Sequence, residues 1–202
     1  MCGIHLIWGK GANKKAIQAL VNNSTHRGPD QSAIYSPWHG LWVGVNRLKI
    51  LHPGSDADQP FWDPEGKNLL IWNGEIYNFR ELRGVLSKMG VEFSTQSDTE
   101  VLLQHLKFFG KEGLSKLNGM FALIYVNLVQ KSVLVARDRN GEKPLYYSQS
   151  PETLILSSET KGIAQLIDPE LDPAQISPYY YFRSASPGKT FYKGIREWKI
   201  GR

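Results

Sequence analysis

The residues best suited to chemistry stand at the start of the chain, in Met1-Cys2-Gly3. Cys2 is the only cysteine among 202 residues, and removal of Met1 would make it the N-terminal residue. An N-terminal cysteine carries a thiol and an α-amine, which in model peptides titrate within about two pH units of neutrality. The amine can take the thiol proton and return it to a leaving nitrogen without a histidine. The sequence therefore predicts a cysteine nucleophile with its own base, against the alternative of a buried, inert thiol.

Reaction of a thiol with an amide also needs donors for the oxyanion that develops. Asn73-Gly74 follows the apolar run 69–72 and can aim a side-chain amide and a backbone N–H at one oxygen. The same dipeptide is typical of a tight hairpin turn. From these residues alone both interpretations stay open.

A free amino acid substrate would present a carboxylate and an ammonium group. Arg47 can bind a carboxylate through two parallel N–H donors, and the carboxylates of Glu75 and Asp98 can accept from an ammonium group. Each residue has a structural alternative. Arg47 can be a surface arginine, Glu75 a solvated acid, and Asp98 an acid that favours the dipole at a helix N-terminus.

Other classes of function lack their residue patterns. The five histidines show no metal-ligand spacing and no accompanying cysteine pair, and the sequence has no G-x-S-x-G motif. The net charge of +5 comes from scattered basic residues interrupted by acids, which disfavours nucleic-acid binding. No apolar run approaches the roughly 20 residues of a membrane helix, and no signal-peptide pattern is present. With its single cysteine, the sequence predicts a cytoplasmic protein that binds neither nucleic acid nor membrane.

The elements that must position these residues follow from apolar periodicity. Strands are predicted at 4–8, 32–35, 41–45 and 69–72, and helices after the caps Asn13, Asn78 and Ser97. Asn78 and Ser97 are each followed three residues later by a glutamate, the spacing of a capping box. From Gly119 onward the pattern predicts an antiparallel meander with strands at 120–126, 132–135, 145–147 and 154–156, and then a helix over 159–166.

The order of these elements predicts an α+β fold. The apolar strands suffice for two stacked antiparallel sheets with helical cover. The sequence has no βαβ alternation with a GxGxxG motif, which disfavours a dinucleotide-binding fold. The last forty residues are rich in Pro and Gly without strong periodicity, and this composition predicts a tail or connector.

Several motifs occur in an order that resembles a known family. They are Met-Cys-Gly-Ile at residue 1, His-Arg-Gly-Pro-Asp at 26–30, Arg47-Leu48, Asn-Gly-Glu-Ile-Tyr-Asn at 73–78, Ser97-Asp98, Gly-Met-Phe-Ala at 119–122 and Ala-Arg-Asp-Arg-Asn-Gly-Glu-Lys-Pro-Leu-Tyr, which begins at Ala136. Together they resemble the glutaminase domain of class II glutamine amidotransferases, of the glutamine-hydrolysing asparagine synthetase type. The resemblance runs from residue 2 to about 165 and more loosely to the end. Asn46, Lys49 and Glu142 depart from the family pattern.

The resemblance implies a four-layer αββα N-terminal-nucleophile hydrolase fold, with two antiparallel sheets between helical layers. It also implies roles for individual residues. Cys2 would be the nucleophile with its own α-amine as base, Asn73 and Gly74 would form the oxyanion hole, Arg47 would bind the glutamine carboxylate, Asp98 and Glu75 would bind its amino group, and the backbone at Ile50 and Leu51 would line the pocket. By analogy, the Arg27-Gly28 turn would support the nucleophile.

The resemblance further divides the chain into a glutaminase domain, residues 1–166, and an extension or connector, residues 167–202, toward a synthetase domain. That domain, with its Ser-Gly-Gly-x-Asp-Ser loop, is absent from this sequence, so we expect the chain to be a fragment of a longer protein. ATP and Mg²⁺ are expected only in the synthetase domain, and the glutaminase domain is expected to need no cofactor. L-glutamine and the synthetase domain are the expected partners, and a homodimer is left open.

Two alternatives to a glutaminase are kept. One is a catalytically silent regulatory or interaction domain of the same fold, which retention of Met1 would support because the amine would then be tied up in a peptide bond. The other is an N-terminal-nucleophile acylase that acts on another amide.

Overall fold

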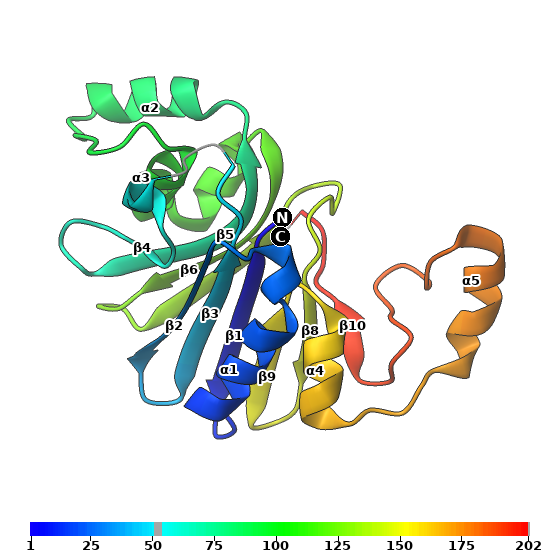
Figure 1. The fold of residues 1–202 in the computed structure, drawn as a ribbon. Coiled ribbons are helices and arrows are strands. Elements are labelled where there is room, and N and C mark those ends of the chain that lie inside the picture. Colours follow the sequence, from blue (N-terminus) through cyan, green and yellow to red (C-terminus); the bar gives the residue numbers. More distant parts are fainter. Residues whose placement is uncertain (51–53, 202) are drawn as a thin grey trace.

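Ten strands form two antiparallel sheets that stack face to face in a computed structural model, which describes residues 1–50 and 54–201 (Figure 1). The strands are β1 (Gly3–Gly9), β2 (Gln31–Trp38), β3 (Leu41–Arg47), β4 (Phe61–Trp62), β5 (Asn68–Ile76), β6 (Gly119–Asn127), β7 (Ser132–Arg137), β8 (Tyr146–Gln149), β9 (Thr153–Ser157) and β10 (Ile195–Glu197). The six-stranded sheet has the order β10-β8-β9-β1-β3-β2, and the four-stranded sheet has the order β4-β5-β6-β7.

Helices cover the outer face of each sheet. The described helices are α1 (Lys14–Asn23), α2 (Phe79–Lys88), α3 (Asp98–Phe109), α4 (Thr160–Ile167) and α5 (Ile176–Phe182), with short 3₁₀ helices η1 (Thr25–Arg27), η2 (Ser55–Ala57), η3 (Gly110–Lys116) and η4 (Pro173–Gln175). Figure 1 shows α1 and α4 against the six-stranded sheet, α2 and α3 over the four-stranded sheet, and α5 away from both. No helix in the described part of the chain is long and apolar enough to cross a membrane.

Alternation of side chains along the strands produces three layers of core. Leu69 and Ile71 of β5 pack between the sheets, with Leu6 of β1 in the same cluster. Leu70 and Trp72, one residue out of phase, pack outward against α2 and α3. Because successive strand residues point to opposite faces, a strand buried on both sides reads as an unbroken apolar run. This packing confirms the predicted α+β class with four layers.

The predicted capping boxes form only in part. Ser97 Oγ accepts from the Glu100 backbone N–H at 3.2 Å, which is one half of the motif. The box predicted at Asn78 is wrong, because this side chain instead bridges to the segment after η3. Its Nδ2 donates to the Lys116 carbonyl at 3.0 Å, and its Oδ1 accepts from the Asn118 N–H at 3.0 Å. Tertiary partners thus replace the local ones that the spacing suggests.

The meander predicted from Gly119 onward divides between the two sheets. β6 and β7 pair in the four-stranded sheet, whereas β8 and β9 pair in the six-stranded sheet. β9 also pairs with β1, with Leu156 opposite Leu6. The hairpin pattern predicts neighbours within each pair correctly. It carries no information about which sheet a pair joins, because that depends on a partner about 150 residues away in the chain.

The C-terminal segment returns to the six-stranded sheet. β10 pairs with β8 at its edge, and Ile195 is buried against α1 and α4. The Arg137 guanidinium donates to Glu197 Oε1 at 2.8 Å and to the Trp198 carbonyl at 3.2 Å. Part of the segment predicted as a connector therefore contributes to a core, while the domain boundary after residue 166 stays a prediction.

Candidate active site

The predicted site residues line one cavity at the end of the sandwich where β1, β3, β5 and α3 meet. The cavity has a volume of about 140 Å³. Of the residues singled out in the sequence, its lining includes Cys2, Arg47, Ile50, Asn73, Gly74, Glu75 and Asp98. Leu51 lies outside the described residues. Residues 96 positions apart in the chain are thus brought to one site, although the roles assigned to them remain predictions.

Cys2, directly before β1, is held by the Asn73 side chain of β5 and by the Leu48 backbone just after β3. Its backbone N–H donates to Asn73 Oδ1 at 2.9 Å. The Leu48 N–H donates to Cys2 Sγ at 3.4 Å. The sulfur also lies 3.9 Å from the Leu48 carbonyl oxygen, so both polar backbone groups of Leu48 contact it. In this chain Met1 is present and also lines the cavity, so the nitrogen beside Asn73 is a peptide nitrogen.

Asn73 has one polar atom in use and one without a partner. Its Oδ1 accepts from Cys2, which fixes the amide so that Nδ2 is on the other side. Nδ2 is buried and has no hydrogen-bond partner among the described residues. A buried unpaired donor costs about 1–3 kcal/mol, so such a group in a cavity wall is a candidate to bind an acceptor on a ligand.

The Gly74 N–H points out of the sheet edge toward the same region. Gly74 lies opposite Phe121 of β6. Phe121 directs its N–H to Asp138 Oδ2 at 3.2 Å and its carbonyl to the Asp138 N–H at 2.8 Å, on the β7 side. Since the two polar groups of an antiparallel residue point the same way, Gly74 and Phe121 form a non-hydrogen-bonded pair. The Gly74 N–H must therefore point away from β6.

On either side of Gly74 along that edge of β5, the outward N–H groups both have hydrogen-bond partners. The Trp72 N–H donates to Gln59 Oε1 at 2.7 Å, and the Ile76 N–H donates to Asp98 Oδ2 at 3.3 Å. Between them, no contact within the described residues takes the Gly74 N–H on this edge. Gly74 and Asn73 Nδ2 thus provide two adjacent donors next to Cys2, which is the arrangement an oxyanion needs.

The hairpin alternative for Asn73-Gly74 is wrong, because β5 continues through both residues to Ile76. Glycine is required here by close packing and not by a turn. A Cβ on Gly74 would lie 2.1 Å from the Met120 carbonyl oxygen and 2.7 Å from Phe121 Cα. The bare backbone lets β5 and β6 approach closely at the site.

Asp98 and Glu75 give the cavity its negative charge. Asp98 is the first residue of α3, held by the Ile76 N–H. Burial raises the pKa of the Asp98 carboxyl above its ordinary value; the N–H donors of Ile76 and Thr99 oppose this rise, and the charge of Glu75 adds to it. Two neighbouring carboxylates that are partly desolvated suit the binding of a cation such as an ammonium group.

Arg47 brings positive charge from the opposite sheet, at the end of β3. Its side chain is 7% exposed, and Nη1 donates to Asp58 Oδ1 at 2.5 Å and to the Gly54 carbonyl at 3.3 Å. Ile50, predicted to contribute only backbone, has a residue exposure of 66%. The cavity wall therefore carries a guanidinium on one sheet and two carboxylates on the side of the other sheet.

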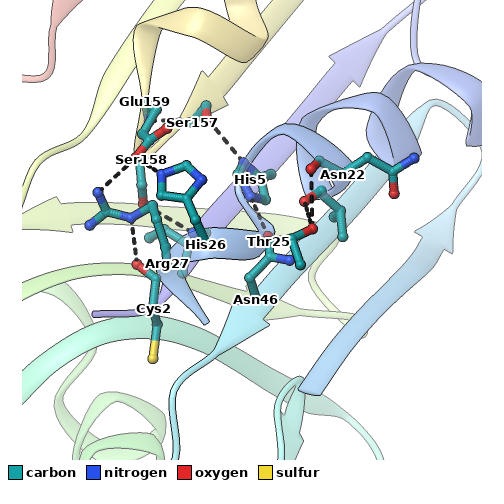
Figure 2. Close-up of polar contacts among 12 residues, drawn as sticks. Cys2, His5, Asn22, Thr25, His26, Arg27, Asn46, Ser157, Ser158 and Glu159 are labelled. Carbon is teal, nitrogen blue, oxygen red and sulfur yellow. Dashed lines mark hydrogen bonds and ion pairs between the residues drawn. The ribbon is translucent and has the colours of Figure 1, made fainter. Parts of the chain in front are cut away.

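A buried arginine supports Cys2 from behind. Arg27 Nε donates to the Cys2 carbonyl at 3.1 Å, and its Nη1 donates to Glu159 Oε1 at 3.1 Å, as Figure 2 shows. The turn that carries Arg27 lies directly on β3, since a Cβ on Gly28 would be 2.5 Å from backbone atoms of Asn46 and Arg47. These contacts place the Arg27-Gly28 turn where the resemblance expects it.

Three further residues of the cavity are not found by the sequence reasoning. Leu48 acts through its backbone N–H, which side-chain patterns do not reveal. Lys143, 9% exposed, follows Gly-Glu in a motif that carries no assigned role, and its N–H is fixed by Asp138 Oδ2 at 3.1 Å. Gln59 has no sequence signal, because its contact with Trp72 is purely tertiary.

Comparisons with known proteins agree with this geometry. The model of a family described as glutamine amidotransferase domain matches residues 1–202. Asparagine synthetase [glutamine-hydrolyzing] 1 of Bacillus subtilis is 34% identical over 215 residues, a match that covers 100% of this chain and 33% of that protein. Asparagine synthetase [glutamine-hydrolyzing] 2 of Oryza sativa subsp. japonica is 34% identical over 169 residues, covering 81% of this chain and 28% of that protein. The chain thus spans about a third of the length of these curated relatives.

Two solved structures share this architecture. Glutamine phosphoribosylpyrophosphate amidotransferase from B. subtilis, complexed with ADP and GMP, superposes with a TM-score of 0.69 at 23% identity, covering 85% of this chain and 46% of that chain. An allosteric regulatory enzyme of purine biosynthesis also gives 0.69 at 23% identity, covering 80% of this chain and 43% of that chain. This likeness confirms the predicted fold.

Proposed function

The chain belongs to the glutamine amidotransferase domain family, and from this premise we propose that it hydrolyses L-glutamine to L-glutamate and ammonia through a thioester on Cys2. Removal of Met1 would turn the nitrogen now 2.9 Å from Asn73 Oδ1 into a terminal amine. That amine takes the proton of the Cys2 thiol, and the sulfur attacks the side-chain amide carbon of glutamine.

The tetrahedral intermediate places a negative charge on the former amide oxygen. Asn73 Nδ2 and the Gly74 N–H stabilise this charge. The terminal ammonium returns its proton to the amide nitrogen, the C–N bond breaks, and ammonia leaves a Cys2 thioester. Water then attacks the thioester carbon, the amine accepts a proton from that water, and glutamate leaves as the thiol is restored.

The observation that carries the proposal is the buried, unpartnered Nδ2 of Asn73 beside the backbone nitrogen of Cys2. A purely structural asparagine would satisfy both of its polar atoms in the fold. Here Oδ1 orients Cys2, and Nδ2 can donate to a charged acceptor on a ligand. The proposed reaction requires both tasks.

The zwitterionic end of glutamine has matching groups in the same cavity. Arg47 binds the α-carboxylate, and Asp98 with Glu75 binds the α-ammonium. The backbone at Ile50 contributes to the wall, and Leu51 keeps this role as a prediction. Among the described residues, no group of three or more His, Cys, Asp or Glu side chains is placed to hold a metal ion, and the steps above use only protein groups.

In the full-length context, we propose that the ammonia serves an ATP-dependent amidation of the asparagine synthetase type. The relatives are named glutamine-hydrolysing asparagine synthetases and are about three times as long as the matched region. In this proposal ATP and Mg²⁺ belong to a C-terminal synthetase domain, and the protein works in the cytoplasm.

The test is glutamine hydrolysis by the chain with Met1 removed, verified by intact-mass measurement. We expect glutamate and ammonia in equal amounts, and loss of activity in Cys2→Ala. Equal rates from the wild-type chain and Cys2→Ala would refute the proposal. A purified protein that retains Met1 and is inactive, and stays inactive when Met1 is removed enzymatically, would favour the silent regulatory domain instead.

A further inference from the structure

Asp58 contacts the guanidinium of Arg47 from outside the cavity. Arg47 lines the cavity, and so do Ala57 and Gln59 on either side of Asp58, but Asp58 itself does not. Asp58 Oδ1 accepts from Arg47 Nη1 at 2.5 Å and pairs with Lys49 Nζ at 2.9 Å. The carboxylate therefore holds the guanidinium without itself lining the cavity.

Such an anchor matters because the cavity contains charges of both signs. Glu75 and Asp98 line it together with Arg47. A guanidinium on a flexible stem would pair with a nearby carboxylate in a partly desolvated site, since opposite charges attract more strongly there than in water. An internal ion pair across the cavity would neutralise the groups that have to bind a zwitterion.

Asp98 and Arg47 are instead each held on their own side. The Ile76 N–H holds Asp98 Oδ2 at 3.3 Å on the β5 side. On the β3 side, Nη1 has two N–H groups, and Asp58 Oδ1 and the Gly54 carbonyl accept from this nitrogen. Lys49 also pairs with Asp58, so this carboxylate contacts two cations on the β3 side.

We propose that Asp58 is a positioning residue that holds Arg47 apart from the carboxylates of the cavity and thereby makes the site specific for a free α-amino acid. This inference rests on the proposed function and adds to it a determinant of specificity. Asp58 does not touch the reacting atoms and acts only through Arg47. Its loss should weaken recognition of the α-carboxylate and leave the chemistry at Cys2 unchanged.

The experiment compares Asp58→Asn with Asp56→Asn, a matched change of an exposed acid in η2, two residues earlier. Hydrolysis is measured with L-glutamine and with 4-aminobutanamide, which lacks the α-carboxylate. We expect Asp58→Asn to raise KM for glutamine by about tenfold with kcat within about twofold, because uniform binding is lost. Turnover of 4-aminobutanamide should be unchanged, Asp58→Glu should recover part of the affinity, and Asp56→Asn should resemble the wild type.

Binding separates this inference from the proposed function. In a Cys2→Ala background, which cannot turn over, L-glutamine affinity is measured by calorimetry with and without Asp58→Asn. Weaker binding supports the role of Asp58 even if the wild-type chain hydrolyses no glutamine, which would refute the proposed function alone. Unchanged glutamine affinity, or an equal loss of activity toward both substrates, would overturn the inference. Urea unfolding of each variant identifies a loss that arises from misfolding.

Discussion

Asn73 shows at the scale of a single residue how the fold prepares a site. An asparagine amide has an acceptor and a donor end that can exchange by a flip about its last bond. The Cys2 N–H, directed at Oδ1 at 2.9 Å, removes this freedom because it can donate only to the carbonyl end of the amide. The donor end is therefore oriented before any ligand binds, and no reorganisation is needed when charge develops.

We expect Asn73→Ala to lower kcat for glutamine hydrolysis by about 10²–10³-fold, the usual cost of one oxyanion donor. KM should change much less, because the donor acts on a charge that is absent from the ground state. Steady-state kinetics with L-glutamine measures both values. Asn140→Ala, in an exposed loop outside this cavity, is the control. A kcat for Asn73→Ala within threefold of the wild type would contradict the role of Asn73.

Asp98 predicts a pH dependence of substrate binding. Its pKa is raised above the ordinary aspartate value, chiefly by burial. Binding of an ammonium group needs the ionised form, so KM for glutamine should rise as the pH falls toward the raised pKa, and at a higher pH than an unperturbed aspartate would require. Asp98→Asn should raise KM at neutral pH and abolish this limb of the profile. A wild-type KM that stays constant down to the ordinary aspartate pKa would contradict the assignment.

The same shift has the opposite sign for stability. The folded state binds the Asp98 proton more tightly than the unfolded state, so the stabilising contribution is complete below the ordinary pKa and is lost as the pH rises through the raised one. At neutral pH the ionised carboxylate therefore costs stability. We expect Asp98→Asn to raise Tm at pH 7 and to have less effect near pH 4, which thermal unfolding at the two pH values measures.

At the scale of elements, the sequence predicts the strands and the residues on them better than their spatial order. Cys2, Arg47, Asn73 and Asp98 could be singled out because each has a side chain suited to the chemistry and lies at the end of a predicted element. Their convergence in one cavity could not be deduced from spacing, since it depends on two sheets stacking. The family motifs supplied that step.

The features that the sequence did not predict have related physical causes. The hairpins β6-β7 and β8-β9 were predicted, but their assignment to different sheets depends on a distant strand. Asn78 has the spacing of a cap, yet it satisfies the backbone of Lys116 and Asn118. Asp58 has no signal at all, because its function is defined by the partner it contacts. Local patterns predict local bonds and cannot predict which polar groups exchange them for tertiary partners.

The turn at Gly28 is an element whose shape the site depends on. We expect Gly28→Ala to destabilise the protein by roughly 1–3 kcal/mol, because its Cβ would be 2.5 Å from backbone atoms of β3. It should also lower glutaminase activity by displacing Arg27 from the Cys2 carbonyl. Urea unfolding and activity are measured together. Gly84→Ala, exposed within α2 with nothing within 4 Å, should instead stabilise by roughly 0.5–1 kcal/mol. Equal effects of the two changes would contradict this account.

At the scale of the whole molecule, the last segment of the described chain is part of the sandwich. β10 closes the edge beside β8 and places Ile195 in the core under α1 and α4. The buried Arg137 spans from β7 to this segment through Glu197. The segment thus connects the two sheets through one guanidinium, in addition to lengthening one of them.

This connection predicts that a chain ending at residue 166 is less stable than the full chain. Ile195→Ala alone should cost about 2–5 kcal/mol, the usual range for a buried isoleucine, and the shortened chain should lose at least as much. Leu171→Ala, 65% exposed in the same segment, should change the free energy of unfolding by less than about 0.5 kcal/mol. Urea unfolding compares the four proteins. Equal stability of the short and full chains would show that residues 1–166 form an independent unit.

The brevity of β4 has a consequence for how this edge is protected. β4 pairs only with Leu69 and Leu70, so most of the outer margin of β5 has no neighbouring strand among residues 1–50 and 54–201. Exposed margins of this kind invite pairing with foreign strands. Among the described residues, the N–H groups of Trp72 and Ile76 on this margin donate to Gln59 and Asp98, and the Gly74 N–H between them has no partner. One N–H without a partner is too little to pair with a foreign strand, yet it can donate to one oxygen atom. The margin of β5 is therefore protected against aggregation, while the Gly74 N–H stays available to a ligand.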